Sequence, residues 1–359
     1  MARLGGDEFV VVLEDLAAGA ADAAGQAGVI AERIRAALAQ SYLVGDYVHR
    51  GSSSIGVVLF ETPRDDLDTV LARADSAMYQ AKRGGRDGVH FFDAGLQSRL
   101  AERAALDREM RAALAAEQFE LFYQVQVDAA ERPCGAEALI RWRHPERGLV
   151  MPGAFIAAAE ESGFIRLLGA WVLRAACRQL VAWQASPHTR AMRLSVNVSA
   201  KQFAQFDFVA HVQDVLDETG APPSLLRLEL TESTALRDVE RTVETMRALK
   251  GLGVRFSMDD FGSGYSSLTY LRRLPFDELK IDQSFVRGLG QDGVGVAIVR
   301  SIVAMSEALG IDVVAEGVET ADERAALAAH GCGTYQGYLF GRPIPARDFE
   351  AALAAVEAG

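Results

Sequence analysis

This sequence is organised around one stretch, Met258-Asp259-Asp260-Phe261-Gly262-Ser263-Gly264. The mostly apolar residues 254–258 predict a short buried strand before the acid pair. Neighbouring side chains on a strand point to opposite faces, so two acids that serve one site require the strand to end between them. Adjacent carboxylates also repel each other, by about 4 kcal/mol at roughly 4 Å and an effective dielectric near 20, which predicts a positive group nearby. A solvated Asp-Asp-x-Gly turn is the alternative, and acids at other strand ends argue against it.

Length and charge bound the classes of protein to which this chain can belong. Its 359 residues suit two domains, and half of them are hydrophobic, so a sizeable core can form. The net charge of −12 argues against a nucleic-acid polymer as partner but allows a small phosphate ligand held through metal ions. The separated Cys134, Cys177 and Cys332 predict reduced thiols in a cytoplasmic protein. No apolar run is long enough for a membrane segment, and residues 1–8 show no signal region.

The first part of the chain predicts a small α+β unit. Gly5-Gly6-Asp7-Glu8 precedes an apolar strand, which is typical of a tight hairpin whose backbone can approach a phosphate, with an ordinary turn as the alternative. Further elements are expected as helices at 27–39 and 67–83, a strand at 53–60, a helix stop at Gly84-Gly85 and a helical run at 96–116. The expected division is a first domain at 1–93, a helical linker at 94–105 and a second domain at 106–352.

From residue 119 onward, strand and helix patterns alternate. Strands are expected at 121–127, 135–142, 192–198, 225–231, 254–260, 278–282, 311–318 and 333–340. Helices are expected at 164–184, 208–219, 239–252 and 294–309. This alternation predicts a parallel α/β barrel of the TIM type. Residues 128–133 are too few for a crossover helix, so the first two strands should be antiparallel and the barrel a modified one.

In such a barrel the carboxyl ends of the strands meet at one mouth. The side chains that fall there are Glu137, Asn197, Glu229, Asp259, Asp260, Lys280 and Glu316. They include no Cys or His, which argues against zinc, and oxygen ligands suit Mg²⁺ or Mn²⁺. With Asp259 shared between two ions, the set would fit a two-metal centre for phosphoester hydrolysis. Lys280 would then orient the water or offset developing charge.

Plainer roles are open to these residues. Glu137 could pair with Arg141 or Arg143 in a salt bridge, and Lys280 could extend its ammonium to the surface. An unpaired carboxylate inside an apolar strand is costly, which favours a function for Glu229. The residues that could instead be simple turn or loop residues are Asn197, Glu232, Glu316 and Glu319.

The first domain resembles the C-terminal half of a GGDEF domain, the fold of diguanylate cyclases. The resemblance rests on residues 3–9, 53–57, 74–82 and 85–87. It implies that the glycines cradle phosphates and that Asp7 or Glu8 helps to hold metal. The family's first half supplies the opening strand, a metal-binding aspartate and guanine-reading residues, and this chain lacks a match to it. We therefore expect an incomplete core without cyclase activity, and a Met1 that follows a truncation or lies inside a longer native protein.

The second domain resembles the EAL-domain phosphodiesterases. The motifs that carry the resemblance, in the family's order, are Glu137-Ala138-Leu139-Ile140-Arg141-Trp142, Asn197-Val198-Ser199, Glu229-Leu230-Thr231-Glu232-Ser233, Asp259-Asp260-Phe261-Gly262-Ser263-Gly264, Lys280-Ile281-Asp282, Ala315-Glu316-Gly317-Val318-Glu319 and Gln336-Gly337-Tyr338. The resemblance implies a modified TIM (β/α)8 barrel with one antiparallel strand, which hydrolyses cyclic di-GMP to linear 5′-pGpG with two Mg²⁺ or Mn²⁺ ions. The alternatives are a catalytically silent cyclic di-GMP receptor, or part of a bifunctional GGDEF–EAL protein.

The same resemblance implies the metal ligands and the catalytic residues. The first metal would be held by Glu137, Asn197, Glu229 and Asp259. Asp259, with Asp260 beside it, would bridge to the second metal. The catalytic residues would be Glu137 together with Lys280 and Glu316, which act on the water.

The remaining roles concern the substrate and one loop. Arg141 would contact a substrate phosphate, Leu139 would line the groove, and Gln336 would hold a water-linked position in the substrate site. Glu232 would steady the loop after the Asp pair, and Glu319 would be a second loop anchor. That loop is linked to dimerisation in the family, so a homodimer through the second domain is expected.

Overall fold

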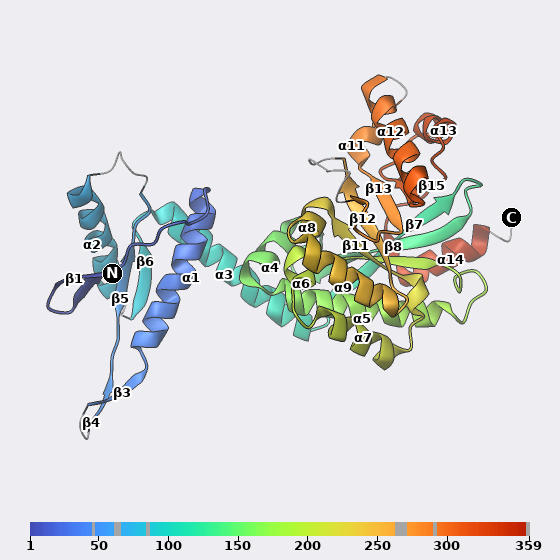
Figure 1. The fold of residues 1–359 in the computed structure, drawn as a ribbon. Coiled ribbons are helices and arrows are strands. Elements are labelled where there is room, and N and C mark those ends of the chain that lie inside the picture. Colours follow the sequence, from blue (N-terminus) through green and yellow to red (C-terminus); the bar gives the residue numbers. More distant parts are fainter. Residues whose placement is uncertain (45–46, 61–65, 84–86, 263–270, 290–292, 357–359) are drawn as a thin grey trace. The chain divides into compact units, whose positions relative to one another are not determined.

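The computed structural model describes residues 1–44, 47–60, 66–83, 87–262, 271–289 and 293–356 (Figure 1). The chain forms two compact units, Met1–Glu109 and Met110–Gly359. The division between them falls within helix α3 (Ala94–Ala115), close to the helical run expected at 96–116. Among the helices in the described ranges, none combines the length and the apolar character that a membrane span requires.

The N-terminal unit is built from short paired strands and two helices. The strand pairs are β1 (Ala2–Gly5) with β2 (Glu8–Val10) and β3 (Ser41–Val44) with β4 (Tyr47–Arg50), both antiparallel, and β5 (Ser54–Val57) with β6 (Gly88–Phe91), parallel. The helices are α1 (Ala20–Leu38) and α2 (Leu67–Arg83). The expected hairpin and the helix at 67–83 are confirmed, whereas the stop at Gly84-Gly85 lies outside the described residues. Helix α1 begins earlier than expected because its Ala-rich first turn favours helix without marking an apolar face.

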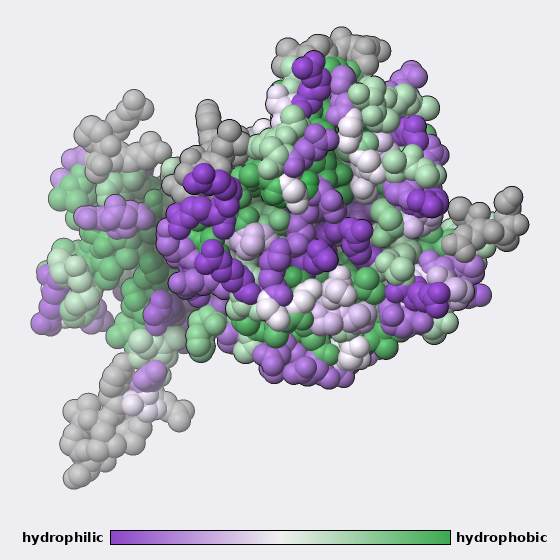
Figure 2. Space-filling view, turned by 45° about the vertical axis from the view of Figure 1, so that its right-hand side comes forward, coloured by the Kyte–Doolittle hydropathy of each residue, from purple (hydrophilic) through white to green (hydrophobic). Residues whose placement is uncertain are grey.

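The buried core of this unit is small. Most of its buried residues are alanines, and one cluster centres on Ala24 and Phe91. Leu4, Phe9 and Val29 are 61%, 57% and 62% exposed. Hydrophobic residues also cover much of the unit's visible surface in Figure 2. The described residues of this unit therefore bury few large hydrophobic side chains.

The second unit is a closed mixed barrel. Its strands, in chain order, are β7 (Phe119–Asp128), β8 (Pro133–His144), β10 (Arg193–Asn197), β11 (Leu226–Thr231), β12 (Arg255–Phe261), β13 (Glu278–Ile281), β14 (Asp312–Ala315) and β15 (Thr334–Gln336). Strand β7 is antiparallel to both of its barrel neighbours, β8 and β15, and the other neighbouring strands are parallel. The modified barrel with one antiparallel strand is thus confirmed. Two short strands flank it, β9 (Gly148–Val150) beside β8 and β16 (Ile344–Pro345) beside β7.

Helices cover the outside of the barrel (Figure 1). The longer ones are α4 (Ile156–Ser162), α5 (Ile165–Trp183), α7 (Phe208–Thr219), α9 (Val239–Gly251), α12 (Gly293–Leu309), α13 (Ala321–Ala329) and α14 (Ala346–Val356). The shorter ones are α6 (Ala200–Phe203), α8 (Glu232–Leu236), α11 (Gln283–Val286), η1 (Pro152–Ala154) and η2 (Pro223–Leu225). Helices α5, α7 and α9 pack side by side. Their apolar faces meet outward strand residues such as Leu194, Leu228 and Phe256 in one continuous core.

The inside of the barrel is polar, which sequence reasoning did not anticipate. Side chains alternate along each strand, so the neighbours of the outward apolar residues point inward. The buried polar residues at these inward positions are Gln124, Gln126, Glu137, Ser195, Arg227, Glu229, Ser257, Glu278, Lys280 and Gln336. TIM barrels are ordinarily filled by branched apolar side chains. Here the interior is held by hydrogen bonds and ion pairs, and the apolar packing lies between strands and helices.

Strand β12 corrects one expectation about the acid pair. The strand does not end between Asp259 and Asp260 but continues to Phe261. Its register with β13 shifts between Met258 and Phe261, and Asp260 has a left-handed φ of 55°. An irregularity of this kind breaks the alternation of side chains. Both acids can therefore serve one site while the strand continues.

Strands β14 and β15 are shorter than expected because the segment after β14 leaves the sheet. Gly317 has a φ of 65°, and Val318 then runs beside the end of β15. The Val318 N–H donates to the Gln336 carbonyl at 3.1 Å, and the Leu339 N–H donates to the Val318 carbonyl at 3.0 Å. This close approach leaves no room for a side chain at Gly337, whose Cβ would lie 2.1 Å from the Val318 carbonyl oxygen.

Replacing Gly337 with alanine should therefore destabilise the barrel, because the atom in the way belongs to the backbone. We expect the free energy of unfolding to fall by about 3 kcal/mol, the upper end of the usual overpacking cost. The control is Gly251→Ala in α9, where an added Cβ meets nothing within 4 Å. Urea unfolding followed by tryptophan fluorescence measures this, since the three tryptophans, Trp142, Trp171 and Trp183, all lie in the barrel unit. Equal stability of the two variants would contradict the packing argument.

Candidate metal and catalytic site

The site is built around the buried side chain of Lys280, which is 1% exposed. Its ammonium lies 2.6 Å from Glu316, 2.9 Å from Glu229, 3.2 Å from Asp259 and 3.3 Å from Glu137. These acids come from β8, β11 and β12 and from the position directly after β14. The positive group predicted beside the acid pair is therefore Lys280, and this lysine does not extend to the surface.

Glu137 is fixed by three donors. The Asn197 amide nitrogen donates to its Oε1 at 2.7 Å, and the Gln336 amide nitrogen donates to its Oε2 at 2.6 Å. Lys280 also donates to Oε2, at 3.3 Å. The simple salt bridge with Arg143 is excluded, because Arg143 pairs with Glu120 at 2.6 Å.

The charges in this cluster shift the pKa values of Lys280 and Glu137 in opposite directions. Burial lowers the pKa of Lys280, but Glu137, Glu229, Glu316 and Asp259 outweigh burial and hold it well above its usual range. Burial also opposes the ionisation of Glu137. The charge of Lys280 and the hydrogen bonds from Gln336 and Asn197 outweigh it, so the net pKa of Glu137 is lowered. Lys280 is thus a cation and Glu137 an anion.

Three other acids of the site, Glu229, Glu316 and Asp260, have raised pKa values. Burial, with Glu137 and Asp259 nearby, raises the pKa of Glu229 well above its usual range. Burial and the charge of Asp259 raise the pKa of Glu316 to about 8. The same two causes raise the pKa of Asp260 to about 6. One ammonium cannot neutralise this many carboxylates, so the site without further cations keeps some of them protonated.

These residues fit a site for divalent cations. Asp259, Asp260 and Glu316 each offer an oxygen within 4.8 Å of the others. The Oε1 atom of Glu229 is buried and accepts no hydrogen bond from any residue that the structure describes. The Asn197 nitrogen is occupied by Glu137, which leaves the amide oxygen as a ligand. An all-oxygen set of this kind suits Mg²⁺ or Mn²⁺.

The other candidate residues lie around this cluster. Leu139 and Arg141 follow Glu137 on β8; Arg141 is buried, with its guanidinium over the Phe122 ring. Glu232 begins α8, and its Oε2 atom is buried with no partner among the described residues.

The last candidates are Glu319 and the loop that follows the acid pair. Glu319 is exposed and lies 3.6 Å from Arg287, so the structure does not bring it into the cluster around Lys280. The predicted loop from Ser263 to residue 270 lies outside the described residues. Gly262, just before it, has a φ of 97°, and a Cβ there would lie 3.0 Å from a ring carbon of Phe285.

Sequence reasoning missed four residues of the buried network. Gln126 donates to the Gln336 Oε1 at 2.8 Å, and Gln336 donates to Gln124 at 3.2 Å. Arg227 and Glu278 form a buried ion pair at 2.5 Å. All four lie two residues from another inward polar residue on the same strand. The strict alternation of apolar and polar residues in segments such as Leu226-Arg227-Leu228-Glu229 is the signal that could have identified them.

The fold and the site can be compared with known proteins. The chain matches the EAL domain over residues 107–343 and the GGDEF domain of diguanylate cyclases over residues 1–88. The bifunctional diguanylate cyclase/cyclic di-GMP phosphodiesterase MucR of Pseudomonas aeruginosa is 42% identical over 355 residues, which cover 99% of this chain and 51% of MucR. The cyclic di-GMP phosphodiesterase PdeR of Escherichia coli is 38% identical over 350 residues, 98% of this chain and 52% of PdeR. This chain therefore spans about half the length of these curated relatives.

Solved structures agree with this comparison. The PaMucR phosphodiesterase in complex with c-di-GMP is 44% identical, with a TM-score of 0.66 over 68% of this chain and 99% of that one. Klebsiella pneumoniae BlrP1 in manganese/cy-diGMP and calcium/cy-diGMP complexes is 31% identical, with a TM-score of 0.56 over 63% of this chain and 56% of that one.

The affinity of the barrel for Mn²⁺ should rise as the pH rises from 6 to 8. A cation must displace the protons held by Asp260 and Glu316, whose pKa values are raised to about 6 and about 8. Each displaced proton adds up to about tenfold in affinity per pH unit. Titration calorimetry in buffers of different ionisation enthalpy measures both the affinity and the protons released. Glu316→Gln should flatten the dependence near pH 8, and a wild-type affinity independent of pH would contradict the protonation states.

Without metal, the same groups make the barrel less stable as the pH rises. The folded-state pKa of Glu316, about 8, is above the ordinary glutamate value. Between these two values the folded state binds more protons than the unfolded state, so stability falls as the pH rises. Thermal unfolding in EDTA, followed by tryptophan fluorescence, should therefore show a lower midpoint temperature at pH 8 than at pH 6.

Proposed function

Because the chain belongs to the EAL domain family and carries part of a GGDEF domain before it, we propose that its barrel hydrolyses cyclic di-GMP to linear 5′-pGpG. The observation that carries the proposal is the buried ammonium of Lys280 among four carboxylates, beside oxygens that converge on a cation position. The descriptions of MucR and PdeR as cyclic di-GMP phosphodiesterases support the choice of substrate.

The acidic residues would hold two divalent cations. The first would be bound by the side chains of Glu137, Asn197, Glu229 and Asp259, and the second by Asp259 and Asp260. When bound, such ions supply positive charge that polarises a phosphodiester and lowers the pKa of water. The manganese complex of BlrP1 supports this assignment.

Glu316 and Lys280 would act on the attacking water. Glu316, held 2.6 Å from the Lys280 ammonium, would accept a proton from that water as its carboxylate, once bound cations have displaced the proton that its raised pKa favours in the empty site. The water oxygen then bonds to phosphorus as the bond to the 3′ oxygen breaks. The 3′ oxygen takes up a proton from solvent, which leaves a 5′ phosphate and a 3′ hydroxyl. Lys280, fixed 2.6 Å from Glu316, would orient this carboxylate and offset the charge that develops on the phosphate. Glu137 would keep the ammonium aligned from the opposite side.

The substrate would be held beside this cluster. Arg141 would bind a phosphate; its guanidinium is oriented by the Phe122 ring at 5.5 Å and by a hydrogen bond to the Ile140 carbonyl at 2.8 Å. Leu139 would line the groove, and Gln336 would hold its water-linked position through Glu137 and Gln124. Glu232 would steady the loop after the acid pair, and Glu319 would anchor the neighbouring loop through Arg287. The homodimer stays a prediction.

The rival proposal is a catalytically silent receptor for cyclic di-GMP. A receptor needs the substrate contacts but not the metal ligands. Every ligand position that the family resemblance identifies carries a suitable oxygen in this chain, from Glu137 on β8 to Asp260 on β12. This retention favours the enzyme.

Incubation with cyclic di-GMP and Mg²⁺ or Mn²⁺ should yield 5′-pGpG, and EDTA should stop the reaction. Glu137→Gln should lower kcat by at least about 100-fold, because the neutral amide forms no ion pair with Lys280 and is a weaker cation ligand than a carboxylate. Glu146→Gln, in the exposed turn after β8, is the matched control and should keep full turnover. Separation of the nucleotides by chromatography measures both. Tight binding without product from the wild-type chain would favour the receptor instead.

Ca²⁺ should bind but fail to support turnover. It is larger than Mg²⁺ and accepts looser geometry, so it would fill the acidic site without aligning the water. Rates measured in Mg²⁺ with increasing Ca²⁺ should fall towards zero. Equal rates in the two metals would argue against the two-metal assignment.

A further inference from the structure

A second ion pair lies directly below the site, towards the amino ends of the strands. Arg227 precedes Glu229 by two residues on β11, and Glu278 precedes Lys280 by two residues on β13. The Arg227 guanidinium lies 2.5 Å from Glu278, and their side chains are 2% and 3% exposed. The Ser257 hydroxyl on β12 donates to the other Glu278 oxygen at 3.0 Å.

The signs of these four charges alternate. Strand β11 carries a base and then an acid, and β13 carries an acid and then a base. Residues two apart on a strand share a face and are separated by about 6.6 Å. Each buried charge therefore has an opposite charge across the barrel and another on its own strand. Burial raises the pKa of Glu278 above its usual range, and the charges of Arg227, Lys280 and Arg193 only partly offset this.

We infer that Arg227 is a positioning residue, which keeps Glu278 from competing for the ammonium of Lys280. Without Arg227, Glu278 would lose its ion-pair partner, and the remaining cations whose charge reaches it are Lys280 and Arg193. The lysine ammonium sits on a flexible four-carbon chain and can turn towards it. That movement would take the ammonium away from Asp259 and Glu316, the two residues next to the proposed reaction. The expected effect of Arg227 on turnover rests on the proposed function.

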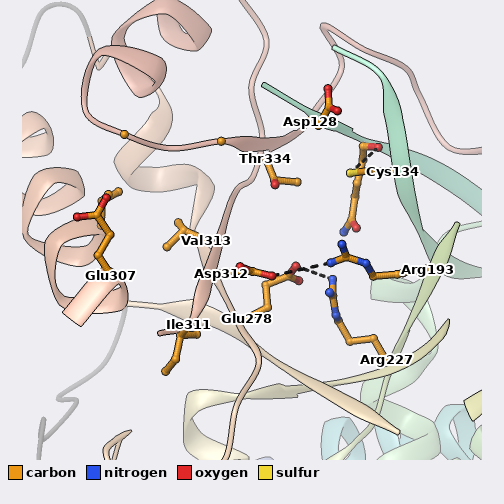
Figure 3. Close-up of a pocket in the computed structure, with 14 residues that line it drawn as sticks. Asp128, Cys134, Arg193, Arg227, Glu278, Glu307, Ile311, Asp312, Val313 and Thr334 are labelled. Carbon is orange, nitrogen blue, oxygen red and sulfur yellow. Dashed lines mark hydrogen bonds and ion pairs between the residues drawn. The ribbon is translucent and has the colours of Figure 1, made fainter. Parts of the chain in front are cut away.

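A cavity makes this pair accessible from below. Arg227 and Glu278 line a space of about 480 Å³, together with Arg193, Asp312, Cys134 and Thr334 (Figure 3). The side chains of Arg193 and Asp312 are 42% and 72% exposed, so solvent reaches the cavity. The Nε atom of Arg227 has no hydrogen-bond partner in the described part of the chain. Truncation of Arg227 would enlarge the cavity beside Glu278, and a small cation could then enter.

The test uses the full chain with Arg227→Ala. We expect kcat to fall about 10- to 100-fold, the usual loss when a supporting residue is removed, while the KM for cyclic di-GMP changes little. The affinity for Mn²⁺, measured by calorimetry, should rise at least about threefold, because the competing ammonium has moved and one positive charge is gone. A collapsed site would instead lose both turnover and Mn²⁺ affinity.

Chemical rescue makes the test specific. Millimolar guanidinium should enter the cavity of Arg227→Ala, pair with Glu278 and reverse both effects, whereas urea, which has a similar shape but no charge, should not. The double variant Arg227→Met with Glu278→Met, which removes both charges, should recover most of the turnover. Arg193→Ala is the control on the same cavity wall and should behave as wild type. Tryptophan fluorescence checks that each variant is folded.

The outcomes separate the two proposals. If the wild type lacks turnover, the proposed function fails. The role of Arg227 can then still be decided by whether Arg227→Ala binds Mn²⁺ more tightly and whether guanidinium reverses that gain. If the wild type is active and Arg227→Ala keeps its turnover and Mn²⁺ affinity, the inference is wrong. A variant that remains folded but loses both properties and is not rescued by guanidinium also overturns it.

Discussion

A buried ammonium is the constraint on which the barrel depends. A lone charge in a protein interior is too costly to persist, so Lys280 requires anions around it, and the four carboxylates in turn require Lys280. These acids come from different strands, and they meet only if the barrel closes. Closure and the charged cluster therefore support each other. The carboxylates that one ammonium cannot neutralise leave an affinity for further cations.

The barrel can hold so many polar groups because its apolar packing lies elsewhere. Outward residues such as Leu228, Phe256 and Leu279 are fully buried beneath the helices and supply the hydrophobic stabilisation. The interior is then free to carry glutamines, serines and paired charges. Gly135 illustrates the cost of this arrangement, since the Gln126 side chain occupies the space where its Cβ would lie. Each strand therefore carries hydrogen-bonded polar side chains on its inner face and packed apolar side chains on its outer face.

Much of the site was predictable because its residues are polar or charged side chains at the ends of apolar strand segments. Glu229 stood out as an acid inside an apolar strand, and the acid pair predicted a positive group nearby, which the structure identifies as Lys280. The bulge at Asp260 was not predictable, because a left-handed residue inside a strand follows from how β12 meets β13. The pair of Arg227 and Glu278 was also missed. Each residue alone reads as an ordinary charge near a strand start, and only their contact across β12 makes them a buried pair.

The sequence by itself determined the order of strands and helices and the reversal of β7, because periodicity and loop length are local properties. It also determined which residue types reach the mouth of the barrel. Only the tertiary structure decided which of them touch and which hold protons. Glu137 and Lys280 are 143 residues apart in the chain yet 3.3 Å apart in space. Such distances depend on closure of the whole barrel, and pKa values depend on burial and on charges from several strands at once.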